Sequence, residues 1–165
     1  MRQSAELGSM VARQEITDVL VAYCCHLDRM ELAALAALFT ADCSVIYGEG
    51  PALAANGRPQ LEQSLARMWR WKRTAHHLAN VRITFSQDDE AQSESYVHAW
   101  HEAPDGRTAT IFGRYLDRFV HTSGGWLIAQ RQMEMNGADA GFKLPIPQAP
   151  RASPPAGWRP PAGLD

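Results

Sequence analysis

Residues 91–133 read AQSESYVHAWHEAPDGRTATIFGRYLDRFVHTSGGWLIAQRQM, and this stretch decides the fold. It contains three runs that are rich in aromatic and β-branched residues and that alternate between apolar and polar positions, as half-buried strands do. The segments PDG (104–106) and TSGG (122–125) separate these runs, and both are typical of tight turns. Strands joined by tight turns pair antiparallel, so we expect a β-meander here.

The spacing of apolar residues is different in the part of the chain before this meander. Residues 74–85 still alternate like a strand, but the residues before position 73 repeat every three to four positions, as in helices. We expect a first helix that begins near Ser9, a second over 31–39, a short strand over 43–47, a loop over 49–57 and a third helix over 59–71. Helices followed by a meander predict an α+β domain. Three N-terminal helices on one face of a curved antiparallel or mixed sheet would leave a cone with a cavity.

The composition narrows the class of protein. The chain has 165 residues, a net charge of −2 and a pI near 6.3, so we expect one domain with no attraction to nucleic acid or to acidic membranes. The basic run RMWRWKR (67–73) most simply ends an amphipathic helix, although single-strand binders also interleave cations with tryptophans. The three cysteines of the chain form no disulfide framework. The sequence shows neither an apolar leader nor a membrane-spanning segment, so we expect a cytoplasmic protein.

The C-terminal residues differ from the rest. Seven of the ten prolines lie between Pro145 and Pro161, which excludes a helix or an inner strand. We therefore predict a domain over residues 1–143 and a Pro-rich tail over 144–165 that is mobile or lies across a surface.

Two neighbouring histidines raise the question of which one points inward. Strict alternation along residues 74–85 places His77 with the apolar positions, but a β-bulge would reset the count, so alternation does not decide between His76 and His77. Asp28 lies near the end of the first helix, where the helix dipole disfavours an anion, so it is either solvated in a loop or paired with a cation such as a histidine. Val97 and Ala99 share one face of their strand with His101. Because small residues beside a histidine leave space for another molecule, we expect this face to be the cavity wall.

The segments GRYLDRF and GGWLI, with the order of elements around them, resemble the SnoaL-like branch of the nuclear-transport-factor-two-like superfamily over residues 10–136. The resemblance implies a cone-shaped α+β barrel. This fold carries enzymes, binding domains and assembly subunits, so the fold alone does not fix the activity. The enzymatic members that the chain most resembles are scytalone dehydratase, the bile-acid dehydratase and the hexachlorocyclohexane dehydrochlorinase, which are cofactor-free lyases.

The resemblance also implies a set of site residues. Asp28 and His76 match the family's Asp–His dyad in position and separation, which favours His76 over His77. Tyr47 and His101 match two further positions of scytalone dehydratase, and Tyr23 matches a tyrosine of the bile-acid enzyme. In this interpretation Asp28 orients His76 as the base, and Tyr47 with Tyr23 or a bound water binds the developing enolate. His101 then protonates a departing hydroxide as general acid.

The function that follows is a cofactor-independent lyase of the dehydratase type, or an isomerase, that abstracts an activated proton from a small apolar or polycyclic carbonyl compound. We expect no cofactor and no metal. The alternatives are a non-catalytic ligand-binding or assembly domain, as in the small subunits of ring-hydroxylating dioxygenases, and a hydrolase or cyclase. Arg131 is a candidate counterpart of the dehydrochlorinase's basic residue. The family implies a homodimer or homotrimer formed through the open sheet face. If His76 is the base, a bulge must lie between His76 and Val81, with His77 turned away.

Overall fold

The computed structural model describes residues 2–139, 145–147, 150 and 156–157, and the helices come first along the chain. The N-terminal part consists of α1 (Arg2–Arg29), α2 (Leu32–Ala37), β1 (Phe39–Ile46), the short 3₁₀ helix η1 (Pro51–Leu53), β2 (Ala54–Asn56), α3 (Arg58–Leu65) and the 3₁₀ helix η2 (Ala66–Arg70). The C-terminal part consists of β3 (Arg73–Gln87), β4 (Glu90–Glu102), β5 (Thr108–Thr122) and β6 (Gly125–Ala138).

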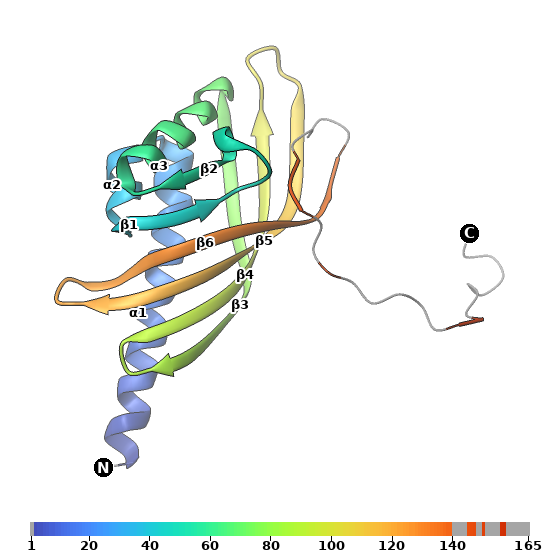
Figure 1. Ribbon diagram of the computed structural model, residues 1–165. Helices are drawn as coiled ribbons and strands as arrows, with labels where there is room; N and C mark the ends of the chain where they lie inside the picture. The colour runs from blue at the N-terminus through green and yellow to red at the C-terminus, as the bar shows by residue number, and fades with distance from the viewer. Residues whose placement is uncertain (1, 140–144, 148–149, 151–155, 158–165) are drawn as a thin grey trace.

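The strands form one six-stranded sheet in the order β2-β1-β6-β5-β4-β3. Neighbouring strands are antiparallel except for β1 and β6, which run parallel, so the sheet is mixed. In Figure 1 the helices gather on one side of the strongly bent sheet, and α1 passes behind the long strands. This confirms the predicted α+β fold class and the predicted meander.

The element boundaries differ from the prediction in the N-terminal part. Helix α1 begins at Arg2 rather than near Ser9, and α2 ends before Phe39, which already belongs to β1. The third helix ends as an α-helix at Leu65 and continues as 3₁₀ turns. The predicted loop over 49–57 contains η1 and β2, because β2 is a three-residue edge strand, Ala-Ala-Asn, that lacks the β-branched and aromatic residues by which strands are recognised.

The apolar stripe of α1 forms the centre of the core. Ile16, Leu20, Tyr23 and Leu27 are at most 3% exposed. They pack in one cluster with inward-facing strand residues, which include Val97, Ala99, Ile111, Tyr115, Phe119 and Ile128. Burial of this stripe against the sheet, rather than helix propensity, holds α1 in place.

A bulge in β3 sets which side chains face the core. The pairing of β3 with β4 shifts register between Ala79 and Arg82, and Asn80 has a positive φ of 49°. Since a bulge inserts one extra residue, the inward positions change phase across it. His76 lies inward before the bulge and Ile83 lies inward after it.

This bulge confirms the predicted bend between His76 and Val81. It also explains why strict alternation, counted back from Ile83, places His77 rather than His76 on the inward face. His77 is exposed and lies opposite His98 of β4 on the other face of the sheet.

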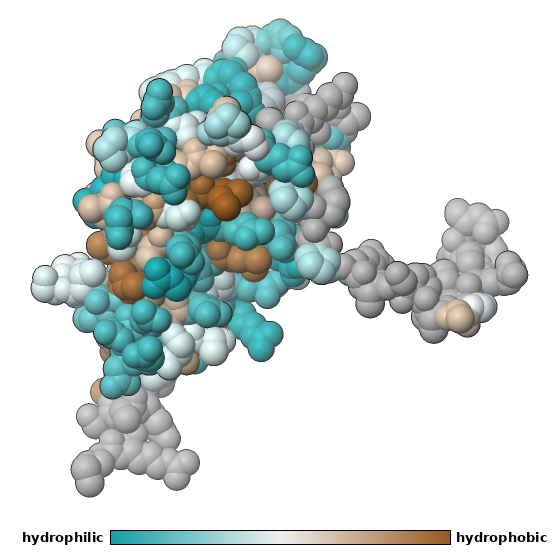
Figure 2. All heavy atoms as spheres, viewed as in Figure 1, coloured by the Kyte–Doolittle hydropathy of each residue, from teal (hydrophilic) through white to brown (hydrophobic). Residues whose placement is uncertain are grey.

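The side of the molecule that Figure 2 presents is mostly polar. Figure 2 shows that hydrophilic residues cover most of this side of the molecule, while hydrophobic residues gather in a few small patches. Over the part of the chain that the structure describes, no helix combines the length and the apolar character needed to cross a bilayer.

Candidate active site

Asp28 lies in the last turn of α1, against the first residues of β3. Its carboxylate accepts hydrogen bonds from Oγ1 of Thr74 at 2.7 Å, from the backbone N–H of His76 at 2.9 Å and from Nδ1 of His76 at 2.6 Å. Burial acts to raise the pKa of Asp28, but the hydrogen bonds from His76 and Thr74 outweigh burial and lower this pKa below its ordinary value. The partners therefore hold Asp28 as an anion at the unfavourable end of the helix dipole.

The imidazole of His76 is buried beside this carboxylate, with its side chain only 4% exposed. Because a carboxylate only accepts hydrogen bonds, Nδ1 carries the proton that points at Asp28. In the neutral ring, Nε2 then holds a lone pair on the opposite edge. His76 also lines a pocket, so Nε2 is the nitrogen that can accept a proton from a bound molecule.

Two tyrosines supply hydroxyl groups to the same pocket. The hydroxyl oxygens of Tyr23 on α1 and Tyr47, just after β1, lie 2.6 Å apart, and both side chains are buried. Burial raises the pKa of Tyr23, and burial together with the neighbouring Tyr23 raises the pKa of Tyr47 well above its ordinary value. Both hydroxyls therefore keep their protons and can donate hydrogen bonds.

His101 of β4 lies beside His76, with ring centroids 5.5 Å apart. Its Nδ1 lies 3.2 Å from the carbonyl oxygen of Ala109, which can only accept, so Nδ1 carries the proton. Burial, with the neighbouring His76, lowers the pKa of His101 to about 4. The ring is therefore neutral at pH 7 and presents Nε2 as an acceptor, which does not suit the predicted general-acid role.

Four of the five predicted site residues, Tyr23, Tyr47, His76 and His101, thus line one pocket, called here the inner pocket, and Asp28 is hydrogen-bonded to His76 at its wall. Its other lining residues are Leu27, Leu65, Arg67, Met68, Arg70, Ala99, Ile111, Tyr115, Met133 and Ile146. The pocket encloses about 50 Å³, which is room for roughly one or two water molecules. A larger molecule therefore requires the walls to move. The face of β4 that carries Ala99 and His101 is the cavity wall that the sequence favoured.

Part of the predicted tail closes the inner pocket. Ile146 is buried against the pocket. The backbone N–H of Glu49 donates to Pro145 O and that of Met135 donates to Pro147 O, both at 2.7 Å, so residues 145–147 are tied down on both sides of Ile146. This short segment, called here the strap, is laid across the surface as the sequence allowed; the other tail residues are mostly outside the described part, and the domain boundary at 143 stays a prediction.

A buried ion pair that the sequence reasoning did not find supports the tyrosines. Arg131 donates from Nε and Nη2 to the two carboxylate oxygens of Asp117, at 2.7 and 2.8 Å, and both side chains are fully buried. Burial opposes the charge of Arg131, but Asp117 outweighs it and raises the pKa of Arg131 well above its ordinary value. The guanidinium lies 4.0 Å from the ring centre of Tyr23 and 4.2 Å from that of Tyr115. The sequence did contain a sign of this buried carboxylate. Asp117 lies two residues from both Tyr115 and Phe119, so strand alternation places it on the same inward face.

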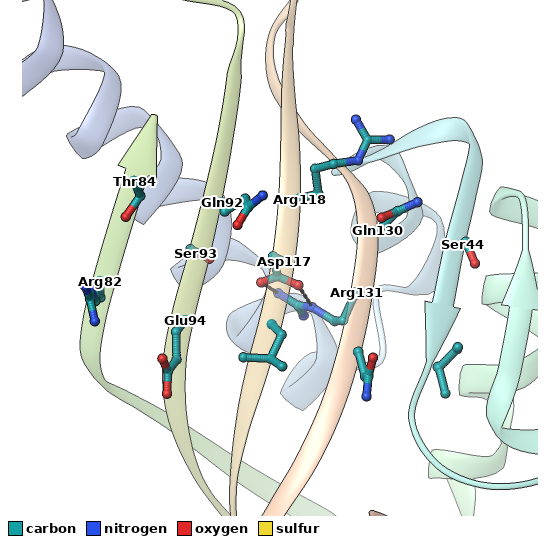
Figure 3. A pocket seen from close by; sticks show the side chains of 13 residues that line it. Ser44, Arg82, Thr84, Gln92, Ser93, Glu94, Asp117, Arg118, Gln130 and Arg131 are labelled. Atoms are coloured by element: carbon teal, nitrogen blue, oxygen red, sulfur yellow. Dashed lines mark hydrogen bonds and ion pairs between the residues drawn. The ribbon is translucent and has the colours of Figure 1, made fainter. Parts of the chain in front are cut away.

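A second, larger hollow lies on the opposite face of the sheet and encloses about 590 Å³. Figure 3 shows polar side chains from β1, β3, β4, β5 and β6 around it, with the Asp117–Arg131 ion pair at its floor. None of the five predicted site residues lines this outer hollow. We therefore place the candidate active site in the inner pocket.

The described residues contain no group of three or more His, Cys, Asp or Glu side chains close enough to hold a metal ion. The three cysteines are free. Cys24 is buried, which raises the pKa of its thiol to about 12, and Cys43 is buried too. Neither has the environment of a reactive thiolate.

Comparison with known proteins supports the resemblance. Residues 9–132 match the family model of the SnoaL-like domain. A protein of Novosphingobium aromaticivorans, provisionally named a scytalone dehydratase, is 28% identical; the match covers 88% of this chain and 98% of that chain, with a TM-score of 0.82. Another protein of that organism, provisionally named an aromatic ring hydroxylase, is 25% identical, with 79% and 93% covered and a TM-score of 0.73.

A hexachlorocyclohexane dehydrochlorinase from Novosphingobium barchaimii shares the fold, with 19% identity, 86% and 99% covered and a TM-score of 0.72. No curated protein matches the chain. The family model spans most of the chain, and the observed mixed sheet with its covering helices is the fold of these structures. The chain belongs to the SnoaL-like family, within the nuclear-transport-factor-two-like superfamily.

Proposed function

We propose that this protein is a cofactor-independent lyase of the dehydratase type, or an isomerase, in which the Asp28–His76 pair abstracts an activated proton. The observation that carries the proposal is the hydrogen bond of 2.6 Å between Nδ1 of His76 and the Asp28 carboxylate. It fixes the tautomer that leaves Nε2 as a base at the pocket. The solved neighbour provisionally named a scytalone dehydratase supports the same class of reaction.

The first step is removal of a proton from a carbon next to a carbonyl group. Nε2 of His76 takes the proton and becomes part of an imidazolium, which the Asp28 carboxylate stabilises through Nδ1. The electron pair of the C–H bond moves onto the carbonyl oxygen as an enolate. Tyr47, hydrogen-bonded to Tyr23, donates to this oxygen. A donor aimed at such a charge is typically worth about 3 kcal/mol of barrier.

The second step decides between elimination and isomerisation. If the neighbouring carbon carries a hydroxyl group, the enolate re-forms the carbonyl, the C–O bond breaks, and the departing hydroxide takes a proton and leaves as water. The imidazolium of His76 supplies that proton, since neutral His101 donates its N–H to the backbone of Ala109. Without a leaving group, His76 returns the proton to another carbon and the product is an isomer.

The lining of the pocket supports a small substrate with an apolar body. Leu27, Leu65, Met68, Ile111, Met133 and Ile146 surround the polar groups. The strap lies over this lining, so we propose that it moves when a substrate enters. Polycyclic substrates require a larger movement than monocyclic ones, because the enclosed volume is about 50 Å³.

We also propose self-association as a homodimer or homotrimer through the outer face of the sheet, which carries the polar outer hollow. Size-exclusion chromatography with light scattering tests it, and a monomer at all concentrations would refute it. The free cysteines support a reducing compartment, so we propose that the protein is cytoplasmic.

The alternative function is a non-catalytic ligand-binding or assembly domain. The neighbour provisionally named an aromatic ring hydroxylase, at 25% identity, keeps this alternative open. The Asp28–His76 dyad argues against it, since an assembly domain gains nothing from a buried histidine held by two hydrogen bonds to one carboxylate.

A panel of β-hydroxy ketones tests the two functions. We expect the wild-type protein to dehydrate at least one of them and His76→Ala to lose that activity. His76→Ala loses the hydrogen bond to Asp28, so its unfolding midpoint should fall, but it should still be folded at the assay temperature, as its unfolding curve checks. Equal activity of the two would remove His76 from the mechanism, and no turnover of any compound by the wild-type protein would favour the binding domain.

A further inference from the structure

The basic run over residues 67–73 divides into two pairs of cations. Lys72 and Arg73 form ion pairs with the carboxylate of Glu102. Arg67 and Arg70, one turn apart on η2, instead line the inner pocket. Within the described residues no carboxylate pairs with either of them, so their charges remain uncompensated at the site.

The guanidinium of Arg67 is held with one edge unused. Its Nη1 donates to the backbone oxygen and to the hydroxyl of Ser64, and its Cζ lies 4.9 Å from the ring centre of Tyr47. Its Nε is buried and has no hydrogen-bond partner among the described residues. A buried donor without a partner costs free energy, so an acceptor from outside the protein would be stabilised here.

Nε and Nη2 together form the edge through which arginine binds a carboxylate with two parallel hydrogen bonds. Ser64 occupies only the opposite side, at Nη1, with its hydroxyl 2.9 Å away. The fixed position of Nη1 thus orients the carboxylate-binding edge without occupying it.

Arg70 adds a second charge of the same sign. Burial and the nearby Arg67 lower the pKa of Arg70. Its guanidinium lies 5.1 Å from the ring centre of Trp71, whose own ring lies 5.0 Å from that of His101. Arg70 is exposed and Arg67 is half-buried, so solvent weakens the repulsion between the two like charges, and an anion between them relieves what remains.

We propose that the substrate carries a carboxylate, and that Arg67 with Arg70 binds it at the rim of the inner pocket while its carbonyl end reaches His76 and Tyr47. This rests on the proposed function, because it assigns the substrate class of the same site. It narrows the expected apolar carbonyl compound to an acidic one, and it makes Arg67 and Arg70 specificity-determining residues.

The test is binding of matched pairs that differ only in charge. Benzoate and benzamide, cyclohexanecarboxylate and its amide, and 2-naphthoate and its amide are titrated into the full-length protein by calorimetry. A charged hydrogen bond predicts that at least one carboxylate binds about ten- to a hundredfold more tightly than its amide. Sodium chloride should reduce this preference. A panel in which no carboxylate binds more tightly than its amide overturns the proposal.

Substitutions identify which residues cause the preference for a carboxylate over its amide. Arg67→Gln combined with Arg70→Gln should reduce the ratio to about one, while Arg73→Gln, whose side chain pairs with Glu102 outside the pocket lining, should keep it. Arg67→Lys keeps the charge and loses the two-pronged edge, so we expect a ratio between those of the wild type and the double variant. A double variant that folds, by its unfolding midpoint, and keeps the full preference overturns the assignment to these two arginines.

One variant separates this proposal from the proposed reaction. His76→Ala should keep the carboxylate preference, because binding does not need the base. Unchanged turnover by His76→Ala, with the preference intact, would refute only the dyad mechanism. Turnover of neutral ketones with no preference for carboxylates would refute only the charged substrate.

Discussion

The carboxylate of Asp28 lies 2.6 Å from Nδ1 of His76, although 48 residues separate the two in the chain. The last turn of α1, which contains Asp28, and the start of β3, which contains His76, meet only in the folded domain. Since this contact is both a hydrogen bond and an attraction to a charge that forms on His76, it links stability, pH and the proposed reaction.

The first prediction concerns stability in acid. The pKa of Asp28 is lowered below the unfolded value of 3.8, so the unfolded chain binds more protons than the folded protein near this pH. The contribution of Asp28 to stability is therefore present above the unfolded pKa and is lost as pH falls through the folded pKa. Urea unfolding between about pH 6 and pH 2 should show a steeper loss for the wild type than for Asp28→Asn. Parallel losses in the two proteins would show that Asp28 has no special partner.

The second prediction concerns the tyrosine pair. Tyr23→Phe or Tyr47→Phe leaves the other buried hydroxyl without the partner that lies 2.6 Å away. Each single variant should lose about 1–3 kcal/mol of unfolding free energy. The double variant should lose clearly less than the sum, because it leaves no orphan hydroxyl. Urea titrations of the four proteins measure the coupling, and strict additivity would mean that the two hydroxyls do not interact.

The third prediction concerns the buried ion pair. Asp117→Asn leaves the guanidinium of Arg131 charged and fully buried without its counterion, which should cost about 3–5 kcal/mol of unfolding free energy. Replacing both residues, Asp117→Leu with Arg131→Met, should recover much of this loss. The control is Asp105→Asn, which removes the exposed pair with Arg107 and should leave the unfolding midpoint almost unchanged. A small effect of Asp117→Asn would contradict the burial of the pair.

The fourth prediction concerns the strap. A Cβ added at Gly48 would lie 2.8 Å both from the backbone oxygen of Pro145 and from Cδ1 of Leu53, so we expect Gly48→Ala to push the strap away. The amide of Glu49, which donates to that oxygen, should then exchange its hydrogen faster. Gly137→Ala meets nothing within 4 Å and serves as the control. Unchanged exchange at Glu49 in Gly48→Ala would show that the strap is not held there.

Sequence periodicity predicted the parts of this fold that repeat regularly. The stripe of Ile16, Leu20, Tyr23 and Leu27 identified α1, and the turns at 104–106 and 122–125 identified the meander. The edge strand β2 was not predicted, because the three residues Ala-Ala-Asn are too few and too small to show a periodic pattern.

The site was harder to predict because it depends on irregular backbone and on environment. Alternation along β3 selects His77, and only the family resemblance pointed to the bulge near Asn80 that turns His76 inward. The role of His101 depends on burial and on the carbonyl of Ala109, which faces it only through the register of β4 with β5. No pattern within one strand carries that information.

The choice between the two neighbouring histidines tests the central claim most directly. His76 is held by Asp28 at the inner pocket, whereas His77 is exposed on the other face of the same strand and serves as a matched control. The measurement is the dehydration rate of the best β-hydroxy ketone by the wild type, His76→Ala and His77→Ala. Loss of a general base predicts a rate lower by about a hundred- to ten-thousandfold for His76→Ala, and a nearly unchanged rate for His77→Ala. Equal rates for all three proteins, or an equal loss in both variants, would contradict the account.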